Sequence, residues 1–193
     1  MNGTLDLILE ALFTGADEAE EARRDEMAPD IMAKEWVEEF LKRKDIKKNS
    51  DGSYDVIGNA EVDMGQRRLK KIPLKFNKVH DFYCEENELT SLEGSPRFVQ
   101  GEFWCQYNQL TSLKGAPDLV GGNFDASFND LNGDLTGAPR SVGKHFIVEY
   151  NQLTSLNGAP KEVDGAFICG NNRRKFTAED IKEETVVGGW CWR

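Results

Sequence analysis

The chain has only two histidines and four cysteines among its 193 residues, and it lacks the motifs that usually mark a catalytic or metal site. His80 and His145 lie far apart and have no nucleophile at a motif spacing, which disfavours Ser–His or Cys–His catalysis. No two cysteines form the C-x-x-C pair that structural zinc sites favour, and there is no G-x-x-x-x-G-K-S/T loop for a nucleotide. We therefore expect no enzyme, no metal and no cofactor.

Positive charge is also scarce, with 24 Lys and Arg against 34 Asp and Glu and a formal net charge of −10. This balance disfavours nucleic acid or an anionic membrane as a partner and favours a protein with a basic surface. No apolar run approaches the length that spans a bilayer, and the N-terminal segment lacks the basic start of a secretion signal. Reduced thiols are typical of the cytoplasm, where we expect the protein.

What the chain does contain is a repeat of about 21 residues. The phrase Asn-Gln-Leu-Thr-Ser-Leu-x-Gly-Ala-Pro begins at Asn108 and Asn151, and close variants of it begin at Asn87 and Asn129. Two apolar positions and one Asn keep the same period: Val79, Val99, Val120, Val142 and Val163; Phe82, Phe103, Phe124, Phe146 and Phe167; Asn87, Asn108, Asn129, Asn151 and Asn172. A fixed period of this length predicts a solenoid.

Within one unit, Phe103 and Cys105 alternate as in a strand, and Asn108 and Leu110 follow at offsets that turn the chain inward again. This arrangement resembles the leucine-rich repeat, L-x-x-L-x-L-x-x-N-x-L. The same four positions recur as Phe82, Cys84, Asn87, Leu89; as Phe124, Ala126, Asn129, Leu131; and as Phe146, Val148, Asn151, Leu153. Because Gly and Pro occur in every copy, the rest of the unit must return by turns and extended backbone instead of a helix.

The closest resemblance is to the short leucine-rich repeats of secreted bacterial effectors, and to similar Leu-Thr-Ser-Leu-x-Gly-Ala-Pro arrays in phage-encoded proteins. It covers residues 58–176 and implies an α/β solenoid with a parallel β-sheet on its concave face. It also implies a binding role in a bacterial cytoplasm or on a virion. Effector relatives that are ubiquitin ligases carry a separate catalytic domain, for which this chain has no remaining length.

Both ends of such an array need covers, because an open end exposes a sheet edge and the core. We predict a helical and hairpin cap over residues 1–57 and a small helix–strand cap over 177–193. In the first, Asp30 begins a helix and Asp51-Gly52 forms a hairpin turn; in the second, Thr177 and Asp180 form a capping box ahead of a strand-prone segment, Thr185 to Trp192. One face of the predicted N-terminal helix carries Met32, Trp36, Val37, Phe40 and Leu41.

Two features lie next to these caps. A weaker repeat with Arg67 in place of Asn precedes the clear ones and places Val62, Met64, Leu69 and Ile72 inward. The segment from Leu5 to Phe13 is amphipathic and precedes an acidic run from Asp17 to Glu26. A further capping helix with a solvated acidic stretch is the preferred interpretation, and a helix that docks on a partner is the alternative.

The repeated Cys and Asn positions are predicted to be structural. Cys84, Cys105 and Cys169 occupy the inward position that Ala126 and Val148 fill elsewhere, so they should pack as small apolar side chains. A Cys84–Cys105 disulfide would have poor geometry, because adjacent in-register side chains run parallel. The Asn amides should pair with backbone groups of the turning loops.

Function is then expected on the outward face of the strands. Alternation places aromatic and acidic residues there, and aromatic side chains are typical of binding hot spots. The candidate partner-binding residues are Tyr83, Glu85, Glu102, Trp104, Gln106, Tyr107, Asp125, Phe128, Ile147, Glu149 and Tyr150. An equally weighted interpretation is that Tyr107, Phe128 and Tyr150 only stack on one another along the array.

Two functional hypotheses follow. The first is a non-enzymatic module that holds a basic protein segment on its acidic, aromatic face, in a phage or effector setting where the partner is a host protein. The alternative is a structural component of a larger assembly such as a phage particle.

Overall fold

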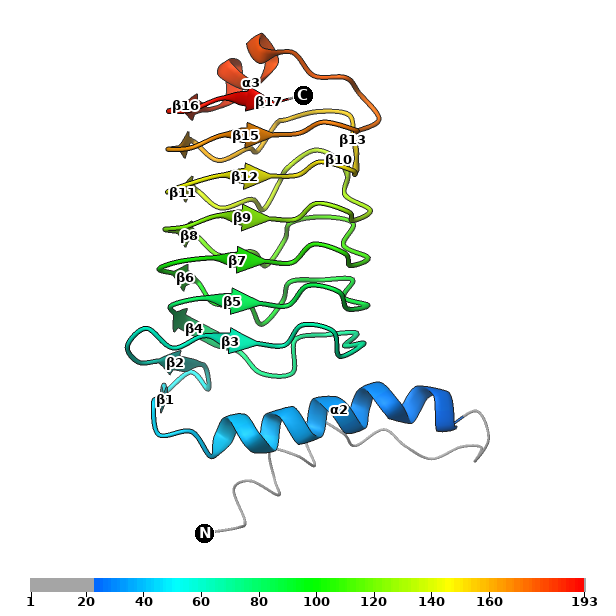
Figure 1. Ribbon diagram of the computed structural model, residues 1–193, viewed down its shortest axis with the longest axis vertical. Coiled ribbons are helices and arrows are strands. Elements are labelled where there is room, and N and C mark those ends of the chain that lie inside the picture. Colours follow the sequence, from blue (N-terminus) through cyan, green and yellow to red (C-terminus); the bar gives the residue numbers. More distant parts are fainter. Residues whose placement is uncertain (1–22, 193) are drawn as a thin grey trace.

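The structure, a computed structural model, describes residues 23–192, in which the repeat folds as a β-solenoid of stacked coils (Figure 1). Most coils contribute one short strand to each of two long sheets. Sheet A has the order β1 (Ile46–Lys48), β2 (Tyr54–Val56), β4 (Phe76–Val79), β6 (Phe98–Val99), β8 (Leu119–Val120), β11 (Ser141–Val142), β14 (Glu162–Val163) and β16 (Val186–Val187). Sheet B has the order β17 (Cys191–Trp192), β15 (Phe167–Ile168), β12 (Phe146–Ile147), β9 (Phe124–Asp125), β7 (Phe103–Trp104), β5 (Phe82–Tyr83) and β3 (Val62–Asp63). A third sheet pairs β10 (Asn132–Gly133) with β13 (Gln152–Leu153).

The repeated apolar residues build the core between sheets A and B. The repeated Val of sheet A lies at most 3% exposed, and the repeated Phe of sheet B is fully buried. The Phe rings form an inner Phe column, with centroid separations of 5.5, 5.3, 5.3 and 5.1 Å along Phe82, Phe103, Phe124, Phe146 and Phe167. The parallel register places each ring directly beside its counterpart in the next coil. The repeated Phe residues therefore form a column along the axis of the core.

The Asn of each repeat joins neighbouring coils. The Asn108 amide donates to the carbonyl oxygens of Cys84 and Cys105 at 2.9 and 3.2 Å, and its oxygen accepts from the backbone N–H of Leu89 at 2.9 Å. We call Asn87, Asn108, Asn129, Asn151 and Asn172 the Asn row. The predicted pairing of these amides with loop backbone is what the structure shows.

Glycine makes the close turns between coils possible. Gly115 has a φ of +91°, and a Cβ there would lie 2.8 Å from the backbone nitrogen of Glu93 in the preceding coil. One coil is longer, with 11 residues from Asn129 to Pro139 against 10 from Asn108 to Pro117. Gly133 lies in that longer stretch, and a Cβ there would meet nothing within 4 Å. The extra residue therefore lies where the chain has open space.

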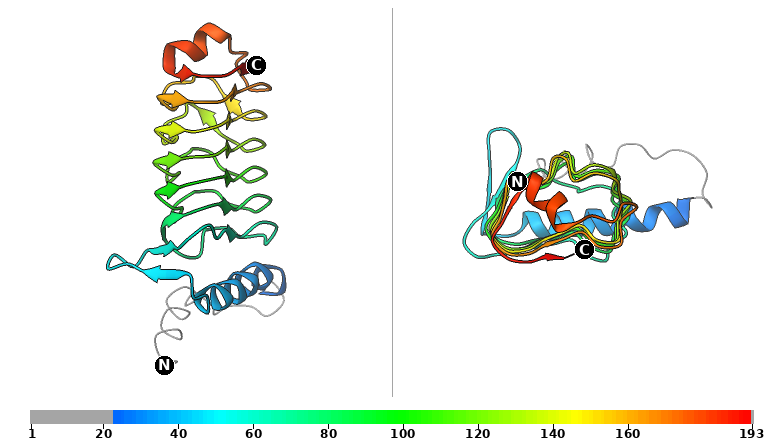
Figure 2. Two further views of the ribbon diagram at one scale, coloured as in Figure 1. Left: turned by 60° about the vertical axis from the view of Figure 1, so that its left-hand side comes forward. Right: turned by 90° about the horizontal axis from the view of Figure 1, so that it is seen from above.

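The predicted repeat solenoid is confirmed, but the fold is mostly β and has a second long sheet that the α/β description lacks. The repeated Val, recognised in the sequence only as a periodic apolar position, lies in the strands of sheet A. Because both long sides of each coil are strands with the same spacing, neither side is thicker and the column is straight (Figure 2). The face predicted to be concave is therefore a flat side of the column, the outer face of sheet B.

Helix α2 (Arg23–Leu41) lies across the N-terminal end of the column (Figure 1). Val37 and Phe40 are buried there, and the Phe40 ring packs 5.4 Å from Phe76. The prediction that this helix begins at Asp30 is wrong, because it begins at Arg23 and continues through Pro29. Strong helix formers around the proline outweigh the one backbone hydrogen bond that proline cannot make. The segment Leu5 to Phe13 and residues 17–22 of the acidic run lie outside the described residues.

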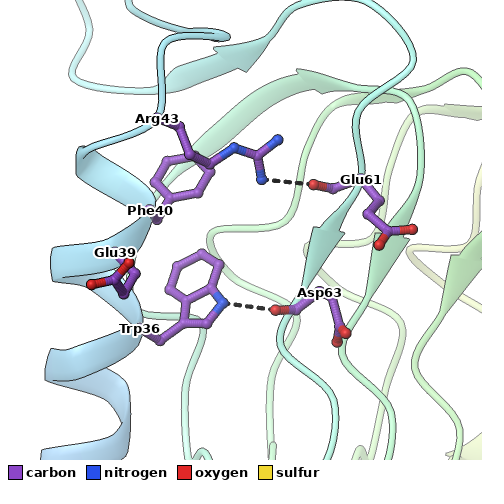
Figure 3. Close-up of a pocket in the computed structure, with 6 residues that line it drawn as sticks. All are labelled: Trp36, Glu39, Phe40, Arg43, Glu61 and Asp63. Atoms are coloured by element: carbon purple, nitrogen blue, oxygen red, sulfur yellow. Dashed lines mark hydrogen bonds between the residues drawn. The ribbon is translucent and has the colours of Figure 1, made fainter.

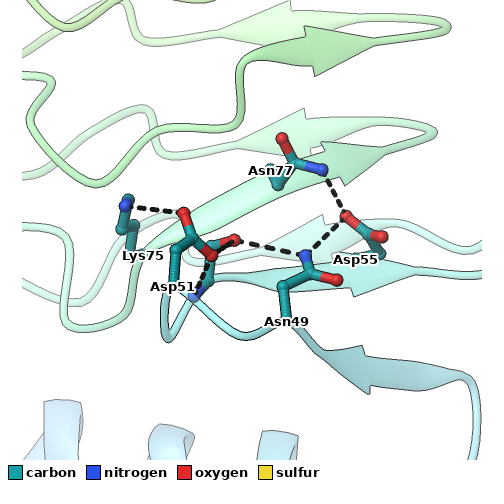
Figure 4. Close-up of polar contacts among 6 residues, drawn as sticks. Asn49, Asp51, Asp55, Lys75 and Asn77 are labelled. Atoms are coloured by element: carbon teal, nitrogen blue, oxygen red, sulfur yellow. Dashed lines mark hydrogen bonds and ion pairs between the residues drawn. The ribbon is translucent and has the colours of Figure 1, made fainter.

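A hairpin connects α2 to the first coil. Strands β1 and β2 pair antiparallel, and Gly52 takes a φ of +81° in the connecting loop, as Asp51-Gly52 predicts. Polar side chains fix this loop (Figure 4): Ser53 donates to Asp51, Lys75 pairs with Asp51 at 2.9 Å, and the Asn49 amide donates to Asp55 at 3.1 Å. Hydrogen bonds from Ser53 and Lys75 hold the pKa of Asp51 well below its usual range.

The C-terminal end consists of helix α3 (Ala178–Glu184) and the last two strands. Thr177 is the N-cap residue, and it exchanges both capping-box hydrogen bonds with Asp180. Ile181 is fully buried, while β16 and β17 add one more strand to sheets A and B. No helix within residues 23–192 combines the length and apolar character needed to cross a membrane.

Candidate binding surface

The register of sheet B assembles most predicted binding residues on one face. Tyr83, Trp104, Asp125 and Ile147 stand directly beside one another on β5, β7, β9 and β12. Two residues further along each coil, the outward positions are Glu85, Gln106, Ser127 and Glu149. The two rows give the outer face of sheet B an aromatic end at β5 and β7 and carboxylates along its length.

Tyr107, Phe128 and Tyr150 form a stack along the bend that follows sheet B, which we call the outer aromatic ladder. Ring centroids are 4.5 Å apart between Tyr107 and Phe128 and 4.3 Å apart between Phe128 and Tyr150. The rings are 50%, 37% and 46% exposed. Each residue has a φ between +51° and +56°, a left-handed conformation that bulky side chains rarely adopt.

Equivalent positions in other coils show that this backbone bend does not need an aromatic residue. Glu86 and Asn171 take φ values of +52° and +53° at the same place in their coils. Asn is among the residues that tolerate this conformation best. The three aromatic residues are therefore a locally unfavourable choice that the coil geometry does not require.

Tyr83 and Trp104 extend the aromatic surface onto the sheet itself, with ring centroids 4.9 Å apart. Burial, followed by the nearby carboxylates of Asp81, Glu61, Glu102 and Glu85, raises the pKa of Tyr83 to about 12. Burial is the main cause of this shift, and the four carboxylates add to it. Trp104 is 37% exposed, so the surface remains accessible.

Three carboxylates on this face are partly desolvated. Burial raises the pKa of Asp125 and of Glu149, and burial together with the charges of Asp63 and Glu86 raises the pKa of Glu85. Glu85 and Gln106 each have one buried oxygen with no hydrogen-bond partner among the described residues. These two oxygens are buried beneath the outer face, so their missing hydrogen bonds are a cost to the fold.

A row of residues just before sheet B has a structural task that the sequence did not reveal. Asp81, Glu102, Asn123 and His145 each accept a hydrogen bond from the backbone N–H at the equivalent position of the next coil, at 2.7–3.1 Å. Glu102 also pairs with Lys144 at 2.9 Å. Burial opposes its ionisation, but bonds from Lys144 and Asn123 outweigh burial and lower the pKa of Glu102. Four different residue types fill these positions, so no sequence pattern marked them.

The cysteines lie in the core at the predicted inward positions. Cys84 and Cys105 are fully buried free thiols on adjacent coils, and burial raises the pKa of both. Within residues 23–192, no group of three or more His, Cys, Asp or Glu side chains could hold a metal ion.

A pocket of about 320 Å³ lies between α2 and β3 and was not anticipated from the sequence (Figure 3). Its walls are formed by Trp36, Glu39, Phe40, Arg43, Glu61 and Asp63. The pocket combines residues from the helical cap with residues from the first coil, which lie about 20 positions later in the chain. Repeat patterns describe coils and carry no information about this junction.

Comparison with known proteins gives no match for this chain. No protein-family model matches the chain, and neither a curated protein nor a solved structure matches it.

Proposed function

We propose that this chain is a non-enzymatic binding module that holds a protein partner on the outer face of sheet B and the outer aromatic ladder. The observation that carries the proposal is the ladder itself: three exposed rings at left-handed backbone positions that Glu86 and Asn171 occupy in other coils. Stacking explains why the rings contact one another, but it does not explain why they are exposed on a column that already has an inner Phe column.

The chemistry of the surface favours a partner with basic groups. Glu85, Asp125 and Glu149 lie beside the aromatic residues, and the chain as a whole carries a net charge of −10. Aromatic contacts supply affinity at protein interfaces, while complementary charge supplies specificity and fast association. Tyr83, Trp104, Gln106 and Ile147 complete the contact surface, and Glu102 contributes charge from its position in the Asp81 row.

We further propose that the repeat is related to the short bacterial leucine-rich repeats. The Asn row and the Leu-Thr-Ser-Leu-x-Gly-Ala-Pro phrase support a relation to the short bacterial leucine-rich repeats, despite the second sheet. That relation supports an effector or phage origin and a host protein as the partner. The alternative role in a phage particle rests on the same resemblance and is an outcome of the test below.

The test is affinity capture from a bacterial lysate, with bound proteins quantified by mass spectrometry. The key variant replaces the ladder by Asn, as Y107N, F128N and Y150N together, because Asn tolerates the left-handed backbone. We expect the variant to remain folded and to lose the partner that the wild type enriches. Leu119→Asn is the matched control, because Leu119 is 42% exposed on the outer side of sheet A.

Equal enrichment by the wild type and the ladder variant would refute the proposed surface. Loss of the partner from both the ladder variant and the Leu119→Asn control would show that capture is not specific to this face. Co-sedimentation of the wild type with phage particles at fixed stoichiometry would favour the structural alternative.

A further inference from the structure

At the pocket between α2 and β3, side chains and not a strand bond the edge of sheet B. In the interior of sheet B, the carbonyls of Asp81 and Tyr83 accept hydrogen bonds from the preceding coil. The matching carbonyls at the edge, those of Glu61 and Asp63, accept instead from Arg43 at 2.8 Å and from the Trp36 indole at 2.7 Å. Side chains thus replace a strand at this edge, and because they are narrower than a strand they leave a hollow between helix and sheet (Figure 3).

The lining of this hollow selects for a cation. Trp36 supplies a partly exposed aromatic ring, which stacks on the buried Phe40 ring with centroids 5.1 Å apart. Glu39, Glu61 and Asp63 supply three carboxylates, of which Glu39 pairs with Lys42 at the surface and Asp63 accepts from the Gly65 N–H. The lining cation, Arg43, is already bonded to Asp45 and to the Glu61 carbonyl. Aromatic faces and carboxylates together favour an ammonium group on an apolar stem.

A basic side chain of another molecule complements this pocket better than the N-terminal residues of this chain. Residues 1–22 of this chain contain no Lys or Arg, so they offer no basic side chain that complements the pocket. The carboxylates come from different sides of the hollow, and Arg43 already lies 5.4 Å above the Phe40 ring. A compact ammonium suits such a dispersed arrangement better than a second planar guanidinium.

We propose that this pocket receives a lysine side chain of the protein partner. The inference rests on the proposed function, and it adds an anchor point beyond the face defined above. Asp63, Tyr83 and Trp104 are in register on β3, β5 and β7, so the pocket and Trp104 are two coil spacings apart, roughly 10 Å. An extended segment that runs along the column covers that distance with about three residues. The recognised sequence therefore places the lysine about three residues from the side chain that contacts Trp104.

The first experiment does not require the natural partner. Acetyl-Gly-Lys-Gly-amide is titrated into the ¹⁵N-labelled full chain, and the Trp36 indole N–H signal is followed by NMR. Acetyl-Gly-norleucine-Gly-amide has the same apolar stem without the charge and is the control probe. We expect a saturable shift of the Trp36 indole with the lysine peptide and none with the norleucine peptide.

The variant arm uses Glu39→Gln with Glu61→Gln. Glu39 is exposed and pairs with Lys42 on the helix surface, so its neutralisation should not disturb the fold. We expect the lysine peptide to bind about fivefold more weakly, as for the loss of two partly exposed ion pairs. Glu162→Gln, on the outer side of sheet A, should leave its affinity unchanged.

Three results would overturn the proposal: no saturable shift with the lysine peptide, equal shifts with the norleucine peptide, or unchanged affinity in the double variant. The lysate capture assay then separates the two proposals. If the ladder variant loses the partner and the Glu39→Gln, Glu61→Gln variant retains it fully, the binding face stands and the lysine pocket fails.

Discussion

The chain builds two aromatic stacks with the same period and opposite surroundings. The inner Phe column has centroid separations of 5.1–5.5 Å and no exposure to solvent. The outer aromatic ladder is even closer, at 4.3–4.5 Å, yet its rings are 37–50% exposed. Ring stacking alone therefore does not distinguish a row that builds the core from a row that is exposed for contact; burial and backbone conformation do.

Phe124→Ala in the inner column should have the largest effect. It removes a fully buried ring from the middle of the stack, and we expect a loss of about 3–5 kcal/mol of unfolding free energy. Urea denaturation followed by circular dichroism measures the loss. A midpoint close to that of the wild type would mean that the column can close over the cavity, and the contrast with the ladder would disappear.

Asn108→Ala tests the other buried row. It leaves the carbonyls of Cys84 and Cys105 and the Leu89 N–H without their partner, and we expect a loss of about 1–3 kcal/mol in the same assay. Asn108→Asp is the matched control, because it retains the acceptor for Leu89 and lacks the donor. An alanine variant as stable as the wild type would contradict a structural role for the Asn row.

Asp125→Asn tests whether a partly buried negative charge on the outer face of sheet B lowers the free energy of unfolding. Burial raises the pKa of Asp125, so the folded chain holds this proton more tightly than the unfolded chain. Protonated Asp125 therefore stabilises the folded chain below the ordinary pKa of Asp, and this stabilisation is lost as the pH rises through the raised pKa.

The Asn variant cannot ionise and retains the oxygen that accepts from Ser127. It should be more stable than the wild type at pH 7 by at most about 1 kcal/mol, and equal to it near about pH 3. Urea midpoints across this pH range measure the difference. A variant that is less stable at neutral pH would show that the charge itself contributes to folding.

Phe128→Asn in the ladder should have the smallest effect on stability. The variant loses two stacking contacts but gains a residue that tolerates a φ near +52°, so we expect a change below about 1 kcal/mol. A loss comparable to that of Phe124→Ala would show that the ladder is structural. The two Phe variants, four residues apart in one coil, thus measure the comparison directly.

Residues that repeat with one chemical type were predictable from the sequence. The repeated Phe, Val and Asn predicted the solenoid, the inward positions and the role of the amides. They could do so because coils stacked in register give equivalent residues the same buried environment. Sheet A was missed, since two-residue strands at the repeated Val carry too little alternation to be recognised. The row of Asp81, Glu102, Asn123 and His145 was missed because four residue types share only a hydrogen-bond acceptor.

The candidate site was predictable only where alternation along a strand applies. Tyr83, Trp104 and Asp125 each follow an inward Phe and are in register with one another, while their role in binding stays a prediction. The left-handed backbone of Tyr107 could not be predicted, because aromatic residues disfavour it and only the coil geometry imposes it. The pocket depends on how α2 lies across β3, which is a matter of tertiary packing.

The longer coil shows where this architecture accepts added length. The extra residue near Gly133 leaves the strand pairs on both sides of it in register, as β8 with β11 and β9 with β12. At Gly121, by contrast, even a methyl group would collide with the Gln100 carbonyl of the coil below. A peptide tag inserted after Gly133 should therefore be displayed on the side of the column with sheets A and B still in register. The cost is the short β10–β13 pair, in which the Gly133 carbonyl accepts from the backbone N–H groups of Thr154 and Ser155. This makes the column suitable as a scaffold for displaying inserted epitopes.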